Sequence, residues 1–115
     1  MPLPETQVRA ALAAVGAFLE KRRPPISIRD KLDYRADIAG SDVFIVAVRP
    51  DHLDKTQKRD TPVAKLKWVA ARKVWRLFWM RADLKWHSYK PFPESAEIAV
   101  LVDVVDRDSN CCFFG

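Results

Sequence analysis

Positive charge and large aromatic side chains coincide in one stretch of this 115-residue chain, residues 63–90. The stretch contains eight lysine and arginine residues and one acidic residue, Asp83, so its charge of +7 exceeds the +5 of the whole chain. It also contains all four tryptophans. Cations can neutralise nucleic-acid phosphates, and flat rings can stack on unpaired bases. The first chemistry that the sequence suggests is therefore nucleic-acid binding.

The side chains that could bind nucleic acid alternate along predicted strands, so they share one side of a sheet. The predicted nucleic-acid-binding residues are Lys65, Lys67, Arg76, Phe78, Lys85, His87 and Tyr89. A sheet surface that offers cations beside rings is a familiar way of binding RNA. The alternative is a solvated charged face, on which the polar loop 50–62 covers Phe78 and Tyr89.

A second pattern concerns carboxylates. Pro50-Asp51, followed by Asp83-Leu84-Lys85, matches the bare pattern of a metal-dependent nuclease, in which two carboxylates hold Mg²⁺ and a lysine stabilises developing charge. In an antiparallel meander the two aspartates would lie roughly 10 Å apart, because two spacings of ~4.8 Å separate their strands. We therefore predict that the protein is not an enzyme and that Asp83 either caps a turn or pairs with Arg81 or Arg76.

The other residues that could do chemistry are dispersed. His52 and His87 lie too far apart for local metal-ligand spacing, and no cysteine accompanies them. The neighbouring Cys111 and Cys112 do not suit a disulfide, whose geometry needs separated Cα atoms. Free cysteines indicate a reducing compartment. The sequence predicts no catalytic, cofactor-binding or metal-binding residues and no cofactor.

The composition predicts one globular domain over residues 1–115, located in the cytoplasm. Apolar residues make up 49% and aromatic residues 10%, which excludes a disordered chain. The chain has no apolar run of the ~18 residues that a membrane span needs, so no membrane partner is expected. Its first residues lack the basic region of a secretory signal.

Hydrophobic periodicity predicts a helix, a sheet and a second helix. Apolar residues recur at helical spacing in the segment 4–22 and again after Ser95, which is predicted to cap the second helix. The first predicted stripe is Val8, Leu12, Val15 and Leu19. The second predicted stripe is Ile98, Leu101, Val102 and Val105. The predicted strands span residues 31–38, 43–48, 63–69, 74–80 and 84–89.

Short turns between these strands predict an α+β fold: an N-terminal helix, an antiparallel meander of about five strands and a C-terminal helix. Both helices are expected on one face of the sheet, giving two layers. A tight turn at residues 70–73 would place Trp68 opposite Trp75 on the covered face. A two-residue turn at 82–83 would bring Trp86 opposite Trp79, on that same face. The apolar tail, residues 111–115, is expected to pack back on the domain.

The segment 64–89 resembles a known bacterial family. Its most specific string is Trp-x-x-x-Trp-x-Arg-x-Asp-x-x-Trp-His-x-Tyr over residues 75–89, and the ending Cys112-Phe113-Phe114-Gly115 fits as well. Over nearly its whole length the chain is similar to the family called domain of unknown function 3024. The resemblance implies a small single-domain bacterial protein in the cytoplasm. It implies no activity, cofactor or catalytic residue.

We therefore expect a small binding module without enzymatic activity that contacts single-stranded or double-stranded nucleic acid through its basic sheet face. The alternative is a protein-interaction or regulatory module without nucleic acid, for which an exposed Phe113-Phe114 tail would form the docking site. A less favoured alternative is a metal-dependent nuclease built on Asp51, Asp83 and Lys85.

Overall fold

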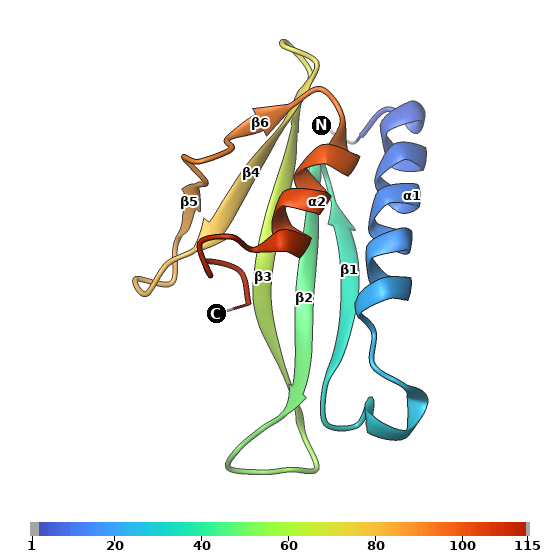
Figure 1. The fold of residues 1–115 in the computed structure, drawn as a ribbon, viewed down its shortest axis with the longest axis vertical. Coiled ribbons are helices and arrows are strands. Elements are labelled where there is room, and N and C mark those ends of the chain that lie inside the picture. The colour runs from blue at the N-terminus through green and yellow to red at the C-terminus, as the bar shows by residue number, and fades with distance from the viewer. Residues whose placement is uncertain (1–2, 115) are drawn as a thin grey trace.

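The computed structural model describes residues 3–114 and confirms the predicted α+β architecture. Helix α1 (Glu5–Arg22) leads through a 3₁₀ turn, η1 (Ile26–Ile28), into one antiparallel sheet. Its strands are β1 (Asp33–Ala39), β2 (Asp42–Pro50), β3 (Lys58–Val69), β4 (Val74–Met80), β5 (Trp86–Ser88) and β6 (Glu94–Ser95). Helix α2 (Ile98–Arg107) follows. Figure 1 shows both helices on the same side of the sheet, as expected.

The strand order is β1-β2-β3-β4-β5, with β6 paired to β4. The sequence did not predict β6, a two-residue strand that lies beside the start of β4. The predicted loop 50–62 is also partly wrong, because Lys58–Pro62 extends β3 along β2. Proline has no backbone N–H to donate to a neighbouring strand. Pro62 is tolerated because it lies at the bulge where the register shifts at Ile45/Val46, and a regular ladder hydrogen bond is not required there. The remaining connection, residues 51–57, lies at the far end of the sheet from β6 (Figure 1).

The buried residues match the predicted stripe in α2 but only partly in α1. The stripe predicted for α2 is confirmed, since all four of its members are buried. In α1 the buried residues are Ala11, Val15 and Phe18, whereas Leu12 is 60% exposed. The buried stripe of α1 is therefore rotated from the predicted one. Ser95 accepts a hydrogen bond from the Glu97 amide, but α2 begins only at Ile98.

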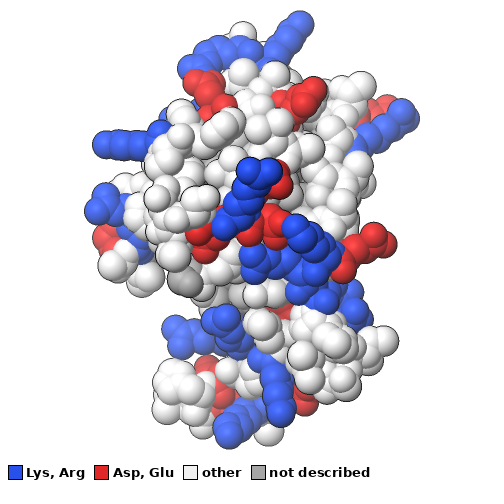
Figure 2. All heavy atoms as spheres, viewed as in Figure 1, with Lys and Arg blue, Asp and Glu red and all other residues white. Residues whose placement is uncertain are grey.

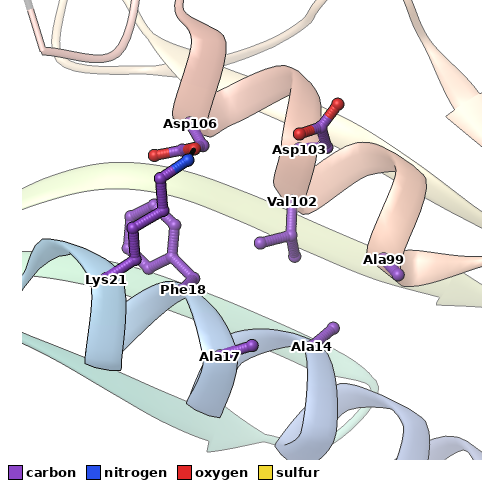
Figure 3. A pocket seen from close by; sticks show the side chains of 8 residues that line it. All are labelled: Ala14, Ala17, Phe18, Lys21, Ala99, Val102, Asp103 and Asp106. Carbon is purple, nitrogen blue, oxygen red and sulfur yellow. Dashed lines mark hydrogen bonds and ion pairs between the residues drawn. The ribbon is translucent and has the colours of Figure 1, made fainter.

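Figure 3 shows the hollow between the two helices. Alanines from both helices line it, with Phe18 at one end, and Lys21 reaches across to Asp106. The Nζ–Oδ2 distance of that ion pair is 2.5 Å, and Arg22 donates to the same carboxylate at 3.0 Å. These contacts join the end of α1 to the end of α2.

The β3–β4 hairpin confirms its predicted register. Trp68 lies opposite Trp75 and Leu66 opposite Leu77, all on the face that the helices cover. The Trp75 side chain is fully buried, and its indole N–H donates to Gln7 Oε1 of α1 at 3.1 Å. We call the opposite side of the sheet the open face.

The predicted register of β5 is wrong by one residue. Trp86 pairs with Met80 instead of Trp79. The turn contains three residues rather than two: the Arg81 amide donates to Lys85 O, and Leu84 adopts a positive φ of 61°. A one-residue slip reverses the direction of every side chain in a strand. Trp86 therefore lies on the open face, apart from the other three tryptophans.

Phe113 and Phe114 of the C-terminal tail pack on the covered face, as expected, whereas Cys111 is exposed and Gly115 lies outside the described residues. Phe113 is buried against Tyr89, with ring centroids 4.9 Å apart. Phe114 lies between the rings of Phe18 and Tyr34. Asp108 fixes this arrangement, because its two carboxylate oxygens accept the amides of Phe113 and Phe114 at 3.0 and 2.8 Å.

Candidate nucleic-acid interface

Four of the seven predicted binding residues meet on the open face. Lys65 lies opposite Phe78, and the next pair along the hairpin on that face joins Lys67 to Arg76. Lys67 is exposed and the other three side chains are half-buried. Phe44 of β2 extends the Lys65–Phe78 row, because Phe44 pairs with Lys65.

The ring of Phe78 lies between two cations. Lys65 Nζ is 5.3 Å from the ring centroid, and Arg76 Cζ is 5.1 Å from it. Cations at this distance are attracted by the electrons of an aromatic face. Neither Lys65 nor Arg76 forms an ion pair with a carboxylate among residues 3–114. Both charges therefore remain available to an anionic ligand.

Two further rings meet on the open face. The ring centroids of Phe44 and Trp86 are 6.0 Å apart, although β3 and β4 separate their strands. Those strands lie about 14 Å apart in a sheet, so the two side chains lean towards each other across the open face. Phe44, Phe78 and Trp86 therefore supply three rings on the side of the sheet that carries the cations. We call these three rings with Lys65, Lys67 and Arg76 the open-face patch.

Two acidic residues flank the open-face patch, and neither position was predicted from the sequence. Asp42 lies opposite Lys67, and Glu94 lies opposite Arg76. Glu94 also pairs with Arg72. The patch is therefore less positive than the charge of +7 in residues 63–90 suggests.

The other three predicted residues lie elsewhere. Tyr89 is 3% exposed, and its hydroxyl accepts from Asn110 Nδ2 at 2.9 Å, so it belongs to the core. His87 pairs with Trp79 and faces the helix side. Lys85 is exposed in the turn before β5. All three placements follow from the three-residue turn, which shifts the strand by one residue.

His87 and Asp83 form a local pair instead of part of the predicted face. His87 Nε2 lies 2.8 Å from Asp83 Oδ2, and the Lys85 amide donates to the other carboxylate oxygen at 3.0 Å. The hydrogen bond with His87 lowers the pKa of Asp83 from its ordinary value. Asp83 therefore caps the β4–β5 turn, as predicted.

The two aspartates of the nuclease pattern do not converge. Asp51 follows the Pro50–Lys58 pair, whereas the end of β4 at Met80 is level with about Val63 of β3. Five residues of β3 at roughly 3.3 Å each therefore separate the end of β2 from the end of β4 by about 16 Å along the sheet. Asp51 instead accepts the Leu53 amide at 2.8 Å. Within the described part of the chain, no group of three or more His, Cys, Asp or Glu residues could hold a metal ion.

Two ring residues of the open-face patch, Phe44 and Trp86, were not predicted. Phe44 lies in the apolar run 43–48, in which alternation is hidden because β2 has apolar residues on both faces. Trp86 depended on the length of one turn. No signal in the sequence gives that length, because Asp83-Leu84-Lys85 has no glycine or asparagine to mark the left-handed position.

The cysteines are free, with Cys111 exposed and Cys112 half-buried. Burial is the main cause that raises the pKa of the Cys112 thiol above its ordinary value. A raised pKa disfavours the thiolate, which is the reactive form. No helix among residues 3–114 is long and apolar enough to cross a membrane.

An antiparallel sheet with two helices on one face, and an aromatic and cationic patch on the other, defines a small two-layer α+β domain. A family model described as domain of unknown function (DUF3024) matches residues 3–115, and the chain belongs to that family. The resemblance stated from the sequence is thereby confirmed. No curated protein and no solved structure matches the chain.

Proposed function

We propose that the protein is a cytoplasmic binding module for single-stranded nucleic acid and that the open-face patch is its binding surface. The observation that supports this most directly is the Phe78 ring between Lys65 and Arg76, beside the rings of Phe44 and Trp86. A base needs a flat apolar surface, and the phosphate next to it needs a cation. The patch offers both within the reach of one nucleotide.

The proposal favours single strands over duplexes for a geometric reason. Rings stack on bases only where the bases are splayed out of a helix. The three rings lie on the side of the sheet opposite the helices, and the connection 51–57 lies at the far end of the sheet (Figure 1). The alternative of a solvated face covered by the loop 50–62 loses its basis, because Lys58–Pro62 continues β3 instead of folding over Phe78.

The competing idea of a protein-interaction module depended on an exposed C-terminal tail. Phe113 and Phe114 are instead packed against Tyr89, Phe18 and Tyr34. We therefore do not propose docking through the tail. The free cysteines support the cytoplasmic location.

The charge part of the proposal is tested by fluorescence anisotropy with a labelled ten-nucleotide single strand at low salt. In Lys65→Gln with Arg76→Gln, we expect affinity to fall at least tenfold and the salt slope to drop by about two, since each lost phosphate contact removes about one released ion. The matched control is Arg9→Gln with Arg107→Gln, which removes two exposed charges from the helices. Absence of binding by the wild type, or an equal loss in the control, would contradict the proposal.

The aromatic part is tested separately. Stacking contributes about 1–3 kcal/mol per base, so Phe78→Ala should weaken the same complex about tenfold or more without changing its salt slope. Quenching of tryptophan fluorescence on binding should disappear in Trp86→Phe, because Trp86 is the indole on the open face. An unchanged affinity in Phe78→Ala would leave only a non-specific charge effect and would reject the stacking surface.

A further inference from the structure

A cleft of about 580 Å³ lies at the end of the sheet where β1 begins, β2 ends and β3 begins. Three separate segments contribute to it: the turn before β1, the end of β2 with the connection after it, and the start of β3. Its charged lining residues are Lys31, Arg49, Lys55 and Lys58, with Asp30 and Asp51. Figure 2 shows lysine and arginine side chains gathered around this end of the molecule, at the bottom of the view.

The register brings two arginines together at this end. Arg49 of β2 pairs directly with Arg59 of β3, and both are exposed. Like charges directly opposite each other in an antiparallel sheet repel and destabilise the pair. The arrangement therefore has an unfavourable interaction that a bound anion would relieve.

Two arginines at this end, Arg49 in the cleft wall and Arg59 beside it, lack the carboxylate partners that three other arginines have. Arg22, Arg23 and Arg35 each donate to a carboxylate within 3.1 Å. Across residues 3–114, Arg49 and Arg59 form no ion pair and no side-chain hydrogen bond. The charge on this end is therefore not neutralised internally.

The backbone around the cleft is held by hydrogen bonds, one of which uses the Asp51 carboxylate. Asp51 Oδ1 accepts the Leu53 amide at 2.8 Å, and the Asp51 amide donates to Gln57 O at 3.0 Å, which closes the connection 51–57. Lys58 Nζ donates to the carbonyl of Asp30 at 2.7 Å and ties β3 to the turn before β1. These bonds fix the cleft in a shape that keeps Arg49 and Lys31 on its wall.

We propose that this cleft binds the phosphate group of a phosphoester. Arginine matches phosphate by donating two parallel hydrogen bonds, and lysines add point charges around it. Four cations line the cleft, with the His52 imidazole beside them and no phenylalanine, tyrosine or tryptophan, so charge recognition of a phosphate dominates over stacking on a base. The volume exceeds that of one phosphate, which leaves room for the group that the phosphate esterifies.

The phosphate has two possible sources: a free phosphomonoester such as a mononucleotide, or the phosphodiester backbone of a nucleic acid. The inference does not depend on the open-face patch, because the cleft shares no residue with it. Arg49 and Arg59 test the cleft, whereas Lys65 and Arg76 test the patch. Failure of one site is therefore distinguishable from failure of the other.

The experiment is an NMR titration of the wild type with inorganic phosphate, adenosine monophosphate and a ten-nucleotide single strand. We expect all three probes to shift the amides of residues 30–31, 49–52 and 58–59. In Arg49→Gln with Arg59→Gln, the affinity for inorganic phosphate should fall at least tenfold, while the charge-matched Lys73→Gln with Lys90→Gln should change it less than twofold. Equal affinity for the two organic probes identifies a monoester, and much tighter binding of the ten-nucleotide strand identifies a backbone.

A second variant separates loss of binding from loss of folding. Arg59→Glu places a carboxylate opposite Arg49 and should raise the thermal midpoint of unfolding, yet abolish the phosphate-induced shifts at 49–52. Absence of shifts in the wild type overturns the proposal. Shifts spread evenly over all surface lysines, or an equal loss in the Lys73/Lys90 variant, also overturn it.

Discussion

The two faces of the β3–β4 hairpin differ in what they contact, although the same two strands supply both. On the covered face, Trp75 and Leu77 are completely buried beneath the helices. On the open face, Arg76 and Phe78 alternate with them and remain half-buried. Period-two alternation thus lets one hairpin provide the core and a candidate binding surface at once. Substitutions on the two faces should therefore separate stability from binding.

The largest expected effect distinguishes two tryptophans of the same segment. Trp75→Ala removes a fully buried ring together with its hydrogen bond to Gln7, and should lower the free energy of unfolding by about 3–5 kcal/mol. Trp86→Ala removes only the contact with Phe44 and a partly exposed surface, and should cost about 1 kcal/mol. Urea denaturation followed by far-UV circular dichroism measures both.

Phe78→Ala is the matched control on the open face and should resemble Trp86→Ala in stability. Equal destabilisation by Trp75→Ala and Trp86→Ala would show that both faces belong to one core. That result would contradict the assignment of Trp86 to the open face.

How far the sequence predicts this structure depends on whether a feature is local. The β3–β4 register was predictable because Trp68, Leu66 and their partners alternate around a tight turn. The face on which Trp86 lies was not predictable, because one more residue in the turn before β5 moves every side chain of that strand to the opposite face. Nothing in the sequence indicated the extra residue, since leucine rarely adopts the positive φ that Leu84 has here. Tyr89 and His87 were misplaced for that same reason.

The candidate sites show the same limit. Lys65, Lys67, Arg76 and Phe78 lie within one hairpin, and their spacing was sufficient to group them. The cleft at the far end of the sheet combines the turn before β1 with the end of β2 and the start of β3, so only the fold brings Lys31 and Lys58 together. The net charge of each sequence segment does not indicate the cleft, because Asp30 and Asp51 offset the charges of the neighbouring Lys31 and Arg49.

The next largest effect concerns the tail on the covered face. Asp108→Asn keeps a residue that tolerates the positive φ of 45° but replaces the carboxylate that accepts two amides. Hydrogen bonds to a charged acceptor are stronger than neutral ones, so we expect a loss of about 1–2 kcal/mol in unfolding free energy. Calorimetry measures it. Faster amide exchange at Phe113 and Phe114 should accompany the loss, and unchanged exchange would mean that Asp108 does not hold the tail.

A smaller effect, dependent on pH, concerns the link between α1 and β1. Arg23 donates to both oxygens of Asp33, at 2.8 and 2.7 Å, and lowers the pKa of Asp33 to about 2. Because the folded-state pKa lies below the unfolded value of about 3.9, the pair stabilises the fold above pH 4 and loses this contribution as pH falls towards 2. Solvent screens these exposed groups, so Arg23→Gln should lower the free energy of unfolding only slightly at pH 6.

The difference between Arg23→Gln and the wild type should vanish near pH 2, where Asp33 becomes protonated in both. Stability curves of the two proteins from pH 2 to pH 7 test this. A constant difference across that range would assign the effect to lost packing of the arginine stem rather than to the ion pair.

The smallest expected effect on stability is at the centre of the open face. Lys67 lies between Asp42 and Arg76 in neighbouring strands, so its attraction to one is offset by its repulsion from the other. Lys67→Gln should therefore leave the free energy of unfolding within about 0.5 kcal/mol of the wild type. If Lys67 contacts a phosphate, this variant should nevertheless weaken single-strand binding several-fold and reduce the salt slope by about one. A stable variant with unchanged binding and an unchanged slope would remove Lys67 from the open-face patch and leave binding to the Lys65–Phe78–Arg76 group.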